Sequence, residues 1–330
     1  MTAETPVCQL LARQDHDYRD WLWVAPPRDA WLEGGSGQLL SGDHGVLAAW
    51  QARGRLSYGP FEAWGEPPGA VLFWPKSHAL GEWWLLALCR QLPTGTPLQV
   101  VGENSGGVKR ALKVLAALGL GCRKRDSARR CTLFETRLGP VALDPELAWQ
   151  RFEAAGLTLV SHPGVFGHGK LDDGTRLLLE VLEQQPAWAG RRVLDVGCGD
   201  GVLSAWLATR GAQVSALDIN AFAVEATRRT LAANAVTGEV IGSDVYAALP
   251  AEVRFDAIVS NPPFHQERDI DYGPTARLID EAPARLTSGG SLILVANAFL
   301  PYPDLLERAF GGFEVLADDR RFRVYRAIKR

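Results

Sequence analysis

The chain has 330 residues, of which 47% are hydrophobic and 22% are charged, and its formal net charge at pH 7 is −3. This composition is typical of a globular protein and excludes a disordered or fibrous chain, and the length predicts two domains rather than one. The negative net charge excludes a uniformly basic nucleic-acid-binding protein, so any contact with RNA must rest on local basic patches.

Cysteine spacing and hydropathy both indicate a cytoplasmic protein. The five cysteines form no C-x-x-C pair, which argues against a zinc site or a disulfide framework and favours a reducing compartment. No window approaches the ~18 apolar residues that span a membrane. Charged residues from Arg13 onward interrupt the N-terminus before a signal sequence could form. We expect a cytoplasmic monomer that contacts no membrane and binds no metal.

Residues 1–150 are less regular than the rest, but they contain a stretch that repeats a later pattern. Lys76 precedes Lys170 by 94 residues, and each lysine precedes an apolar helical run, at 83–88 and 177–182. At the same offset, the sequence VGENSGG overlays DVGCGDG. Both loops follow an apolar strand and open a helix, which in the first half is expected at 108–118. This match predicts an internal duplication.

The first copy lacks the chemistry of the second in this alignment. Glu103 and Ser105 replace two glycines, Lys124 stands where the second copy has Asp218, and Asn-Pro-Pro occurs only in the second copy. We therefore predict a degenerate domain over residues 1–150, which binds RNA or stabilises its neighbour, and a catalytic domain over residues 151–330. The boundary falls within residues 144–156, a stretch that reads as helical.

Strands and helices alternate from residue 191 onward. Strands are predicted at 192–196, 213–217, 238–242, 255–260 and 291–296, helices at 202–209, 221–234 and 275–286, and a terminal antiparallel pair at 313–316 and 322–328 around a charged turn at 317–320. Such alternation indicates an α/β fold with a doubly wound, mainly parallel seven-stranded sheet. We expect two Rossmann-like methyltransferase domains in tandem, each ending with an antiparallel strand.

A glycine-rich turn follows the first strand of the second half. Gly197, Gly199 and Gly201 lie where the strand becomes a helix, and the missing Cβ atoms let the backbone turn tightly against a ligand. Asp218 ends the next strand, as expected of a carboxylate that binds both ribose hydroxyls of an adenosine. The spacing G-x-G-x-G differs from the G-x-G-x-x-G of nicotinamide-binding domains and favours S-adenosyl-L-methionine as the cofactor.

Three further residues are candidates for cofactor binding. Asp195, at the end of the first strand, suits a cationic methionine group better than a pyrophosphate. Asp244, at the end of the third strand, is placed to meet the adenine amine, with a simple turn residue as the alternative. Lys170 contacts the cofactor carboxylate or the RNA backbone, or it is a solvated surface lysine.

The tetrapeptide Asn-Pro-Pro-Phe follows the fourth strand, at the sheet edge where open α/β sheets bind ligands. An exocyclic amine of a nucleobase is a poor nucleophile, because its lone pair is delocalised into the ring. The Asn261 side-chain oxygen and the Pro262 carbonyl can accept its two hydrogens and turn the lone pair toward the sulfonium methyl. Phe264 supplies a face on which an extruded base can stack. His265 is a target-loop residue rather than a general base.

This combination of motifs resembles the class I amino-methyltransferases, and Asn-Pro-Pro-Phe-His resembles their guanine-N2 branch. The segments at 163–174, 295–303 and 322–327 resemble the ribosomal RNA small-subunit methyltransferase C family, whose members also have a degenerate first domain. The resemblance implies S-adenosyl-L-methionine as the cofactor, 16S rRNA of the small ribosomal subunit as the partner, and N2 of a guanine as the methyl acceptor.

Three other functions remain open from the sequence. The first is a guanine-N2 methyltransferase of 23S rRNA, because the large-subunit sibling shares the Asn-Pro-Pro-Phe-His stretch. The second is a non-catalytic rRNA-binding assembly factor, which would not bind adenosylmethionine. The third is a nicotinamide dehydrogenase, which leaves the tetrapeptide unexplained.

Basic clusters gather in the first half although the net charge is negative. They lie at 109–113, 123–125 and 129–130, with a fourth at 320–321. Each is compatible with a solvated surface, but their asymmetric distribution supports a first domain that holds rRNA phosphates electrostatically. The eight tryptophans at positions 21 to 84 are expected in the core, and His162 and His168 flank a glycine stretch without a clear role.

Overall fold

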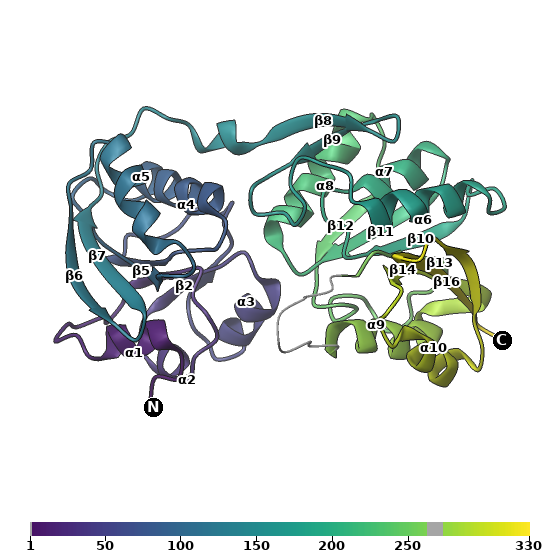
Figure 1. Ribbon diagram of the computed structural model, residues 1–330, viewed down its shortest axis with the longest axis horizontal. Coiled ribbons are helices and arrows are strands. Elements are labelled where there is room, and N and C mark those ends of the chain that lie inside the picture. The colour runs from purple at the N-terminus through teal and green to yellow at the C-terminus, as the bar shows by residue number, and fades with distance from the viewer. Residues whose placement is uncertain (1, 263–272) are drawn as a thin grey trace. The chain divides into compact units, whose positions relative to one another are not determined.

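A computed structural model describes residues 2–262 and 273–330, and the chain divides into two compact units. Unit 1 is Met1–Ala148 and unit 2 is Trp149–Arg330. In Figure 1, the ribbon of unit 1 runs from purple to blue-teal and that of unit 2 from teal to yellow. The boundary predicted after residue 150 falls within the first strand of unit 2.

Unit 2 contains a seven-stranded sheet in the order β12-β11-β10-β13-β14-β16-β15, which is parallel except where β16 pairs with β14 and β15. Its strands are β10 (Arg192–Val196), β11 (Gln213–Asp218), β12 (Glu239–Gly242), β13 (Phe255–Ser260), β14 (Leu286–Asn297), β15 (Glu314–Asp318) and β16 (Phe322–Ile328). Its helices are α6 (Asp173–Glu183), α7 (Val202–Thr209), α8 (Ala221–Ala233), α9 (Gly273–Arg285) and α10 (Tyr302–Phe310). Every strand predicted from residue 192 onward is present, although β15 includes two residues predicted as turn.

Helices cover both faces of this sheet, as the strand pattern requires. Successive side chains of a strand point to opposite faces, so a buried central strand is apolar throughout. Val193 packs with the helices α6, α7 and α8. Its neighbour Leu194 packs on the opposite face with α9 and α10. The doubly wound architecture therefore follows from the period-2 division of apolar side chains between two core clusters.

Unit 1 contains a second seven-stranded sheet, in the order β3-β2-β1-β4-β5-β7-β6. Its strands are β1 (Leu22–Val24), β2 (Gln38–Leu40), β3 (Ser57–Tyr58), β4 (Ala70–Phe73), β5 (Pro97–Glu103), β6 (Cys122–Ala128) and β7 (Cys131–Arg137). Its helices are α1 (Pro6–Ala12), α2 (Ala30–Gly34), α3 (His44–Gln51), α4 (His78–Gln91), η1 (Val108–Arg110) and α5 (Ala111–Ala117). Helices α1, α2 and α3 share one core cluster with the sheet, and six of the eight predicted core tryptophans are buried.

The two sheets have the same strand order when β1 is matched with β10, β4 with β13 and β5 with β14. In both sheets one strand, β16 or β7, runs antiparallel to all the others and lies between the last parallel strand and the edge strand. Two sheets with one topology support the predicted duplication. The same topology shows that the sequence alignment predicted for the two copies is wrong.

The alignment at an offset of 94 residues joins two different strands of the fold. It overlays the loop after β5 on the loop after β10, whereas the counterpart of β10 is β1. Lys124, aligned with Asp218, lies on β6, the edge strand of the sheet, where it pairs with Phe134 of β7. The succession of an apolar strand, a glycine turn and a helix recurs among βα units, so this short pattern could not identify which unit it matched.

Strand register gives the correct counterparts. The Ala25 N–H donates to the Leu40 carbonyl as the Gly197 N–H donates to the Leu217 carbonyl. Val24 therefore stands in the place of Val196 and Trp23 in the place of Asp195. By the same counting, Ser41 stands in the place of Asp218. The residues after β1 are Ala-Pro-Pro, without glycine. Unit 1 has therefore lost the acids and the glycine turn of the cofactor edge, and it is degenerate for reasons other than those predicted.

The segment predicted as helical at 144–156 is mostly extended. After a single turn of 3-10 helix (η2, Pro145–Ala148), β8 (Gln150–Ala154) and β9 (Leu157–Ser161) form an antiparallel hairpin. Ala155 and Gly156 have φ of 53° and 73° and make a two-residue turn of the kind that matches strand twist. The prediction was wrong because an Ala-Gly turn lacks the usual Asn-Gly signal.

Candidate functional site

The glycine loop connects β10 to α7 and has left-handed backbone at all three predicted glycines. The φ angles are 77° at Gly197, 58° at Gly199 and 83° at Gly201. A Cβ on either of the first two would meet no atom within 4 Å, so their surface is open to a ligand. A Cβ on Gly201 would lie 2.8 Å from the Thr227 Cα, so this glycine is required for packing against α8.

Asp195 is completely buried at the end of β10. One carboxylate oxygen accepts a hydrogen bond of 2.6 Å from the Ser204 hydroxyl. The other oxygen, Oδ1, has no hydrogen-bond partner among the residues that the structure describes. Burial raises the pKa of Asp195 to about 7. A buried carboxylate with an unsatisfied oxygen is costly, and a cationic group in contact with it would offset that cost.

Asp218 lies at the end of β11, beside the glycine loop. Its carboxylate accepts the backbone N–H of Gly199 at 3.0 Å and that of Asn220 at 2.9 Å. Burial raises the pKa of Asp218 in spite of these two bonds. The carboxylate is therefore fixed on the strand neighbouring β10, as the sequence predicted for a ribose-binding residue.

Asn220 has a role that the sequence did not reveal. Its side-chain oxygen caps α8 through the Phe222 N–H, and its amide nitrogen donates to the Gly164 carbonyl at 2.7 Å. The second bond attaches the segment that precedes α6 to the carboxyl edge of the sheet. An Asn two residues after Asp218, at the start of an apolar helix, was the available signal for this cap.

Asn261 follows β13 and is held by two side chains from the start of α6. Its amide nitrogen donates to an Asp172 carboxylate oxygen at 3.0 Å and to the Thr175 hydroxyl at 2.8 Å. Because carboxylates only accept hydrogen bonds, the amide orientation is determined by these partners, and both N–H groups are used. The acceptor oxygen Oδ1 is then directed away from α6. Asp172 and Thr175 were missed because no sequence motif joins them to Asn261.

Pro262 is buried next to Asn261. Phe264 and His265 lie outside the described residues, so the predicted stacking face remains a prediction. Asp244, at the end of the β12 strand, forms an ion pair of 2.7 Å with Arg277, and its side chain is 33% exposed. Lys170 is exposed on the loop before α6. The structure therefore brings Asn261, Asp195, Asp218 and the glycine loop to one sheet edge, while Asp244 and Lys170 lie at more exposed positions.

The surroundings of His162 indicate that it has a structural role. Its ring is buried and stacks on Phe222 at 4.7 Å with an angle of 8° between the planes. Burial, with the nearby His168 and Arg229, lowers the pKa of His162 to about 3. The ring is therefore neutral at physiological pH and supports the segment before α6 rather than titrating.

Among the described residues, no group of three or more His, Cys, Asp or Glu side chains could hold a metal ion. In the same part of the chain, no helix is long and apolar enough to cross a membrane.

Family models match both halves of the chain. Residues 156–326 match the methyltransferase small domain, and residues 63–151 match the methyltransferase small domain N-terminal. A relative from Chromohalobacter salexigens, called ribosomal RNA small subunit methyltransferase C, is 68% identical over 100% of this chain and 99% of its own. A protein of the same name from Pseudomonas aeruginosa is 44% identical, over 98% of both chains.

One solved structure is similar over almost the whole chain. It is a 16S rRNA N2 methyltransferase of T. thermophilus in complex with AdoMet and guanosine. It is 32% identical to this chain, covers 99% of it and 92% of its own length, and superposes with a TM-score of 0.86.

Proposed function

Because the chain belongs to the ribosomal RNA small subunit methyltransferase C family, we propose that it transfers a methyl group from S-adenosylmethionine to the exocyclic N2 of a guanine in 16S rRNA. The observation that carries this proposal is the orientation of the Asn261 amide, whose oxygen is directed away from its two anchors at the edge that also holds Asp195 and Asp218. The similar T. thermophilus enzyme, with AdoMet and guanosine in its complex, supports the same assignment.

The residues of unit 2 fit adenosylmethionine. The unsatisfied Oδ1 of Asp195 is a buried acceptor for a cationic methionine group. The Asp218 carboxylate, held by two backbone N–H groups, would bind the ribose hydroxyls. Gly197 and Gly199 leave open space where a Cβ would otherwise project toward the ligand. We also assign Asp244 to the adenine and Lys170 to the cofactor carboxylate or the RNA backbone.

Methyl transfer to the amine depends on alignment of the amine lone pair with the methyl group. Bound adenosylmethionine would supply a methyl group on a sulfonium, from which the neutral thioether leaves with the electrons of the broken carbon–sulfur bond. The Asn261 oxygen and the Pro262 carbonyl accept the two hydrogens of the guanine N2 amine and direct its lone pair, while Phe264 stacks on the base. This arrangement lowers the barrier through positioning and electrostatics. The proton that the amine loses passes to water.

We further propose that unit 1 binds rRNA and that the protein acts as a monomer on the small ribosomal subunit in the cytoplasm. The exposed basic residues of unit 1 support contact with phosphates. They include Lys109, Arg110, Lys113, Arg129 and Arg130. Arg123 and Arg125 are less available, since both pair with Glu135.

The proposal is tested by methylating separated ribosomal subunits from cells that lack the enzyme, with labelled adenosylmethionine, and identifying the modified nucleoside. We expect N2-methylguanine in 16S rRNA. In Asn261→Ala the rate should fall by about 100-fold or more, since one positioned hydrogen-bonding group is removed from the reacting centre. Its Kd for adenosylmethionine should stay unchanged.

Two results would contradict the proposal. Methyl transfer only to 23S rRNA would assign the enzyme to the large subunit. Absence of adenosylmethionine binding by calorimetry, or full activity of Asn261→Ala, would favour a non-catalytic assembly factor.

A further inference from the structure

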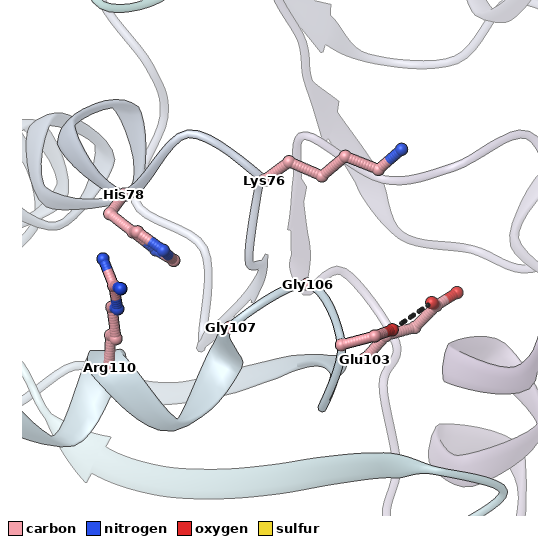
Figure 2. Close-up of a pocket in the computed structure, with 7 residues that line it drawn as sticks. Lys76, His78, Glu103, Gly106, Gly107 and Arg110 are labelled. Atoms are coloured by element: carbon pink, nitrogen blue, oxygen red, sulfur yellow. Dashed lines mark hydrogen bonds between the residues drawn. The ribbon is translucent and has the colours of Figure 1, made fainter. Parts of the chain in front are cut away.

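The structure contains a cavity of about 560 Å³ in unit 1, at the carboxyl ends of β4 and β5. It is lined by Lys76, His78, Glu103, Ser105, Gly106, Gly107 and Arg110. Figure 2 shows that His78 and Arg110 point toward one another on one side, while Glu103 lies on the other side with the Ser105 hydroxyl bonded to it.

This cavity is the counterpart of the amine edge of unit 2 rather than of its cofactor edge. Val24 pairs with Leu72, and its counterpart Val196 lies one residue beyond Asp195, which pairs with Val259. Leu72 therefore matches Ser260, and Phe73 matches Asn261. The loop after β5 corresponds to the loop after β14. Unit 1 has thus lost the acids and glycines that would bind a cofactor but has kept a cavity where unit 2 presents Asn261.

The cationic side of the cavity is suited to a phosphate. Arg110 is exposed and belongs to the short helix η1 that follows the glycine turn. The indole N–H of Trp74 donates to Nδ1 of His78 at 3.4 Å, which leaves Nε2 of that ring as a donor. Lys76 is a second permanent cation at the rim. A guanidinium and a ring N–H form charge-assisted hydrogen bonds with phosphate oxygens.

The opposite side of the cavity is suited to the edge of a base. One Glu103 oxygen accepts the Ser105 hydroxyl at 3.2 Å, which orients the carboxylate, and a carboxylate accepts from amino and imino groups of nucleobases. A ligand of phosphate alone would meet a repulsive charge at Glu103. A nucleotide satisfies both sides, with its phosphate at Arg110 and His78 and its base at Glu103.

We infer that this cavity binds a nucleotide of the RNA substrate, outside the methylation site, and thereby contributes to holding the RNA. The inference rests on the proposed action on rRNA, and it adds a specific site in unit 1. Binding there does not lead to methyl transfer, because Trp23 and Ser41 replace the acids of the cofactor edge.

The test uses the full-length protein with 16S rRNA in small subunits, and compares Arg110→Ala with Arg19→Ala. Arg19 is another exposed arginine of unit 1, which is paired with Asp17 and lies outside the basic clusters. We expect Arg110→Ala to raise the KM for the subunit about tenfold, with kcat within about twofold and an unchanged Kd for adenosylmethionine. The slope of log affinity against log salt should fall by about 1, as expected for one lost phosphate contact.

Substitution of Glu103 distinguishes a nucleotide from a bare phosphate as the ligand of the cavity. With short single-stranded RNA as the probe, Glu103→Ala should weaken binding and reduce the preference among bases, and inorganic phosphate should compete only weakly. Tighter RNA binding by Glu103→Ala would overturn the nucleotide assignment, because it would mean that the carboxylate only repels phosphate. Equal KM values for Arg110→Ala and Arg19→Ala would overturn the site itself. Binding of the short RNA does not depend on whether the wild-type protein methylates 16S rRNA, which is measured separately, so Arg110→Ala and Arg19→Ala are also compared by their Kd for this RNA.

Discussion

Asp195 is an acidic residue without access to water, and its ionisation should depend on whether a cation is bound. Burial raises its pKa to about 7, above the ~3.9 expected in an unfolded chain. The folded protein therefore binds this proton more tightly than the unfolded chain. The associated stability is fully present below about pH 4 and is lost as the pH rises through about 7.

We expect Asp195→Asn to unfold at a higher temperature than the wild type at pH 8 without ligand, and at nearly the same temperature at pH 4. The asparagine stays neutral at every pH and can still accept from Ser204, whereas Asp218, whose pKa is also raised by burial, is common to both proteins. Thermal scans at a series of pH values test this, and adenosylmethionine should stabilise only the wild type. Parallel curves for the two proteins would mean that Asp195 does not titrate in this range.

Thr175 touches Asn261 and should act through it. We expect Thr175→Val to lower kcat about tenfold, because the amide loses one of the two acceptors that determine its orientation. The KM for RNA and the Kd for adenosylmethionine should change little, and Thr175→Ser should recover most of the lost rate.

Thr230→Val is the matched control for Thr175→Val. Thr230 is also buried, and its hydroxyl accepts the Val160 N–H at 2.9 Å, away from Asn261. This variant should lower the melting temperature without lowering kcat. If the two valine variants lost activity in proportion to their lost stability, Thr175 would have only a structural role.

At the scale of the element, the hairpin of β6 and β7 has an unusual turn. Arg129 and Arg130 form its two-residue connection with φ of 52° and 61°, a conformation that costs a non-glycine residue roughly 1–2 kcal/mol. Both side chains are exposed. Strained residues often coincide with function, and two arginines at a hairpin tip are placed to contact RNA.

We expect the double variant Arg129→Asn, Arg130→Gly to be more stable by about 1 kcal/mol and to bind rRNA more weakly, since Asn-Gly suits this turn but carries no charge. Ala155→Asn is the matched control, because it makes the same kind of change in the β8–β9 turn, where no arginine is removed. It should stabilise the protein and leave RNA affinity unchanged. Unaltered RNA affinity in the double variant would mean that the hairpin tip is not part of the RNA-binding surface.

The two hairpins also mark the limit of prediction from sequence for single elements. The strands from residue 192 onward and the helices α7, α8 and α9 were predictable because apolar runs alternate with amphipathic ones, whereas α10 was not predicted. The β8–β9 hairpin was not, because its turn lacks Asn-Gly. The hydrogen bonds that hold the Asn261 amide could not be predicted from the sequence either, since Asp172 and Thr175 come close to Asn261 only after α6 packs on the sheet.

At the scale of the whole molecule, the sequence predicted two related domains but aligned them incorrectly. Local patterns of strand, glycine and helix recur throughout such folds, so similarity between two loops does not establish that they follow equivalent strands. Equivalence is a property of sheet order and register, which depend on pairing between distant residues such as Val24 and Leu72. The chemistry of the cofactor edge was predictable because its glycines and acids are close together in sequence.

The identical strand order of the two units has a consequence for how such a protein can evolve. After a gene duplication, each copy begins with a complete cofactor edge and a complete substrate edge, and selection need retain only one catalyst per chain. Loss of one buried acid and one glycine turn ends catalysis in a copy without disturbing its sheet, because these residues lie at strand ends. The copy that has lost catalysis can then specialise in RNA recognition. One ancestral fold thus provides both the catalytic domain and part of the binding surface for a large RNA.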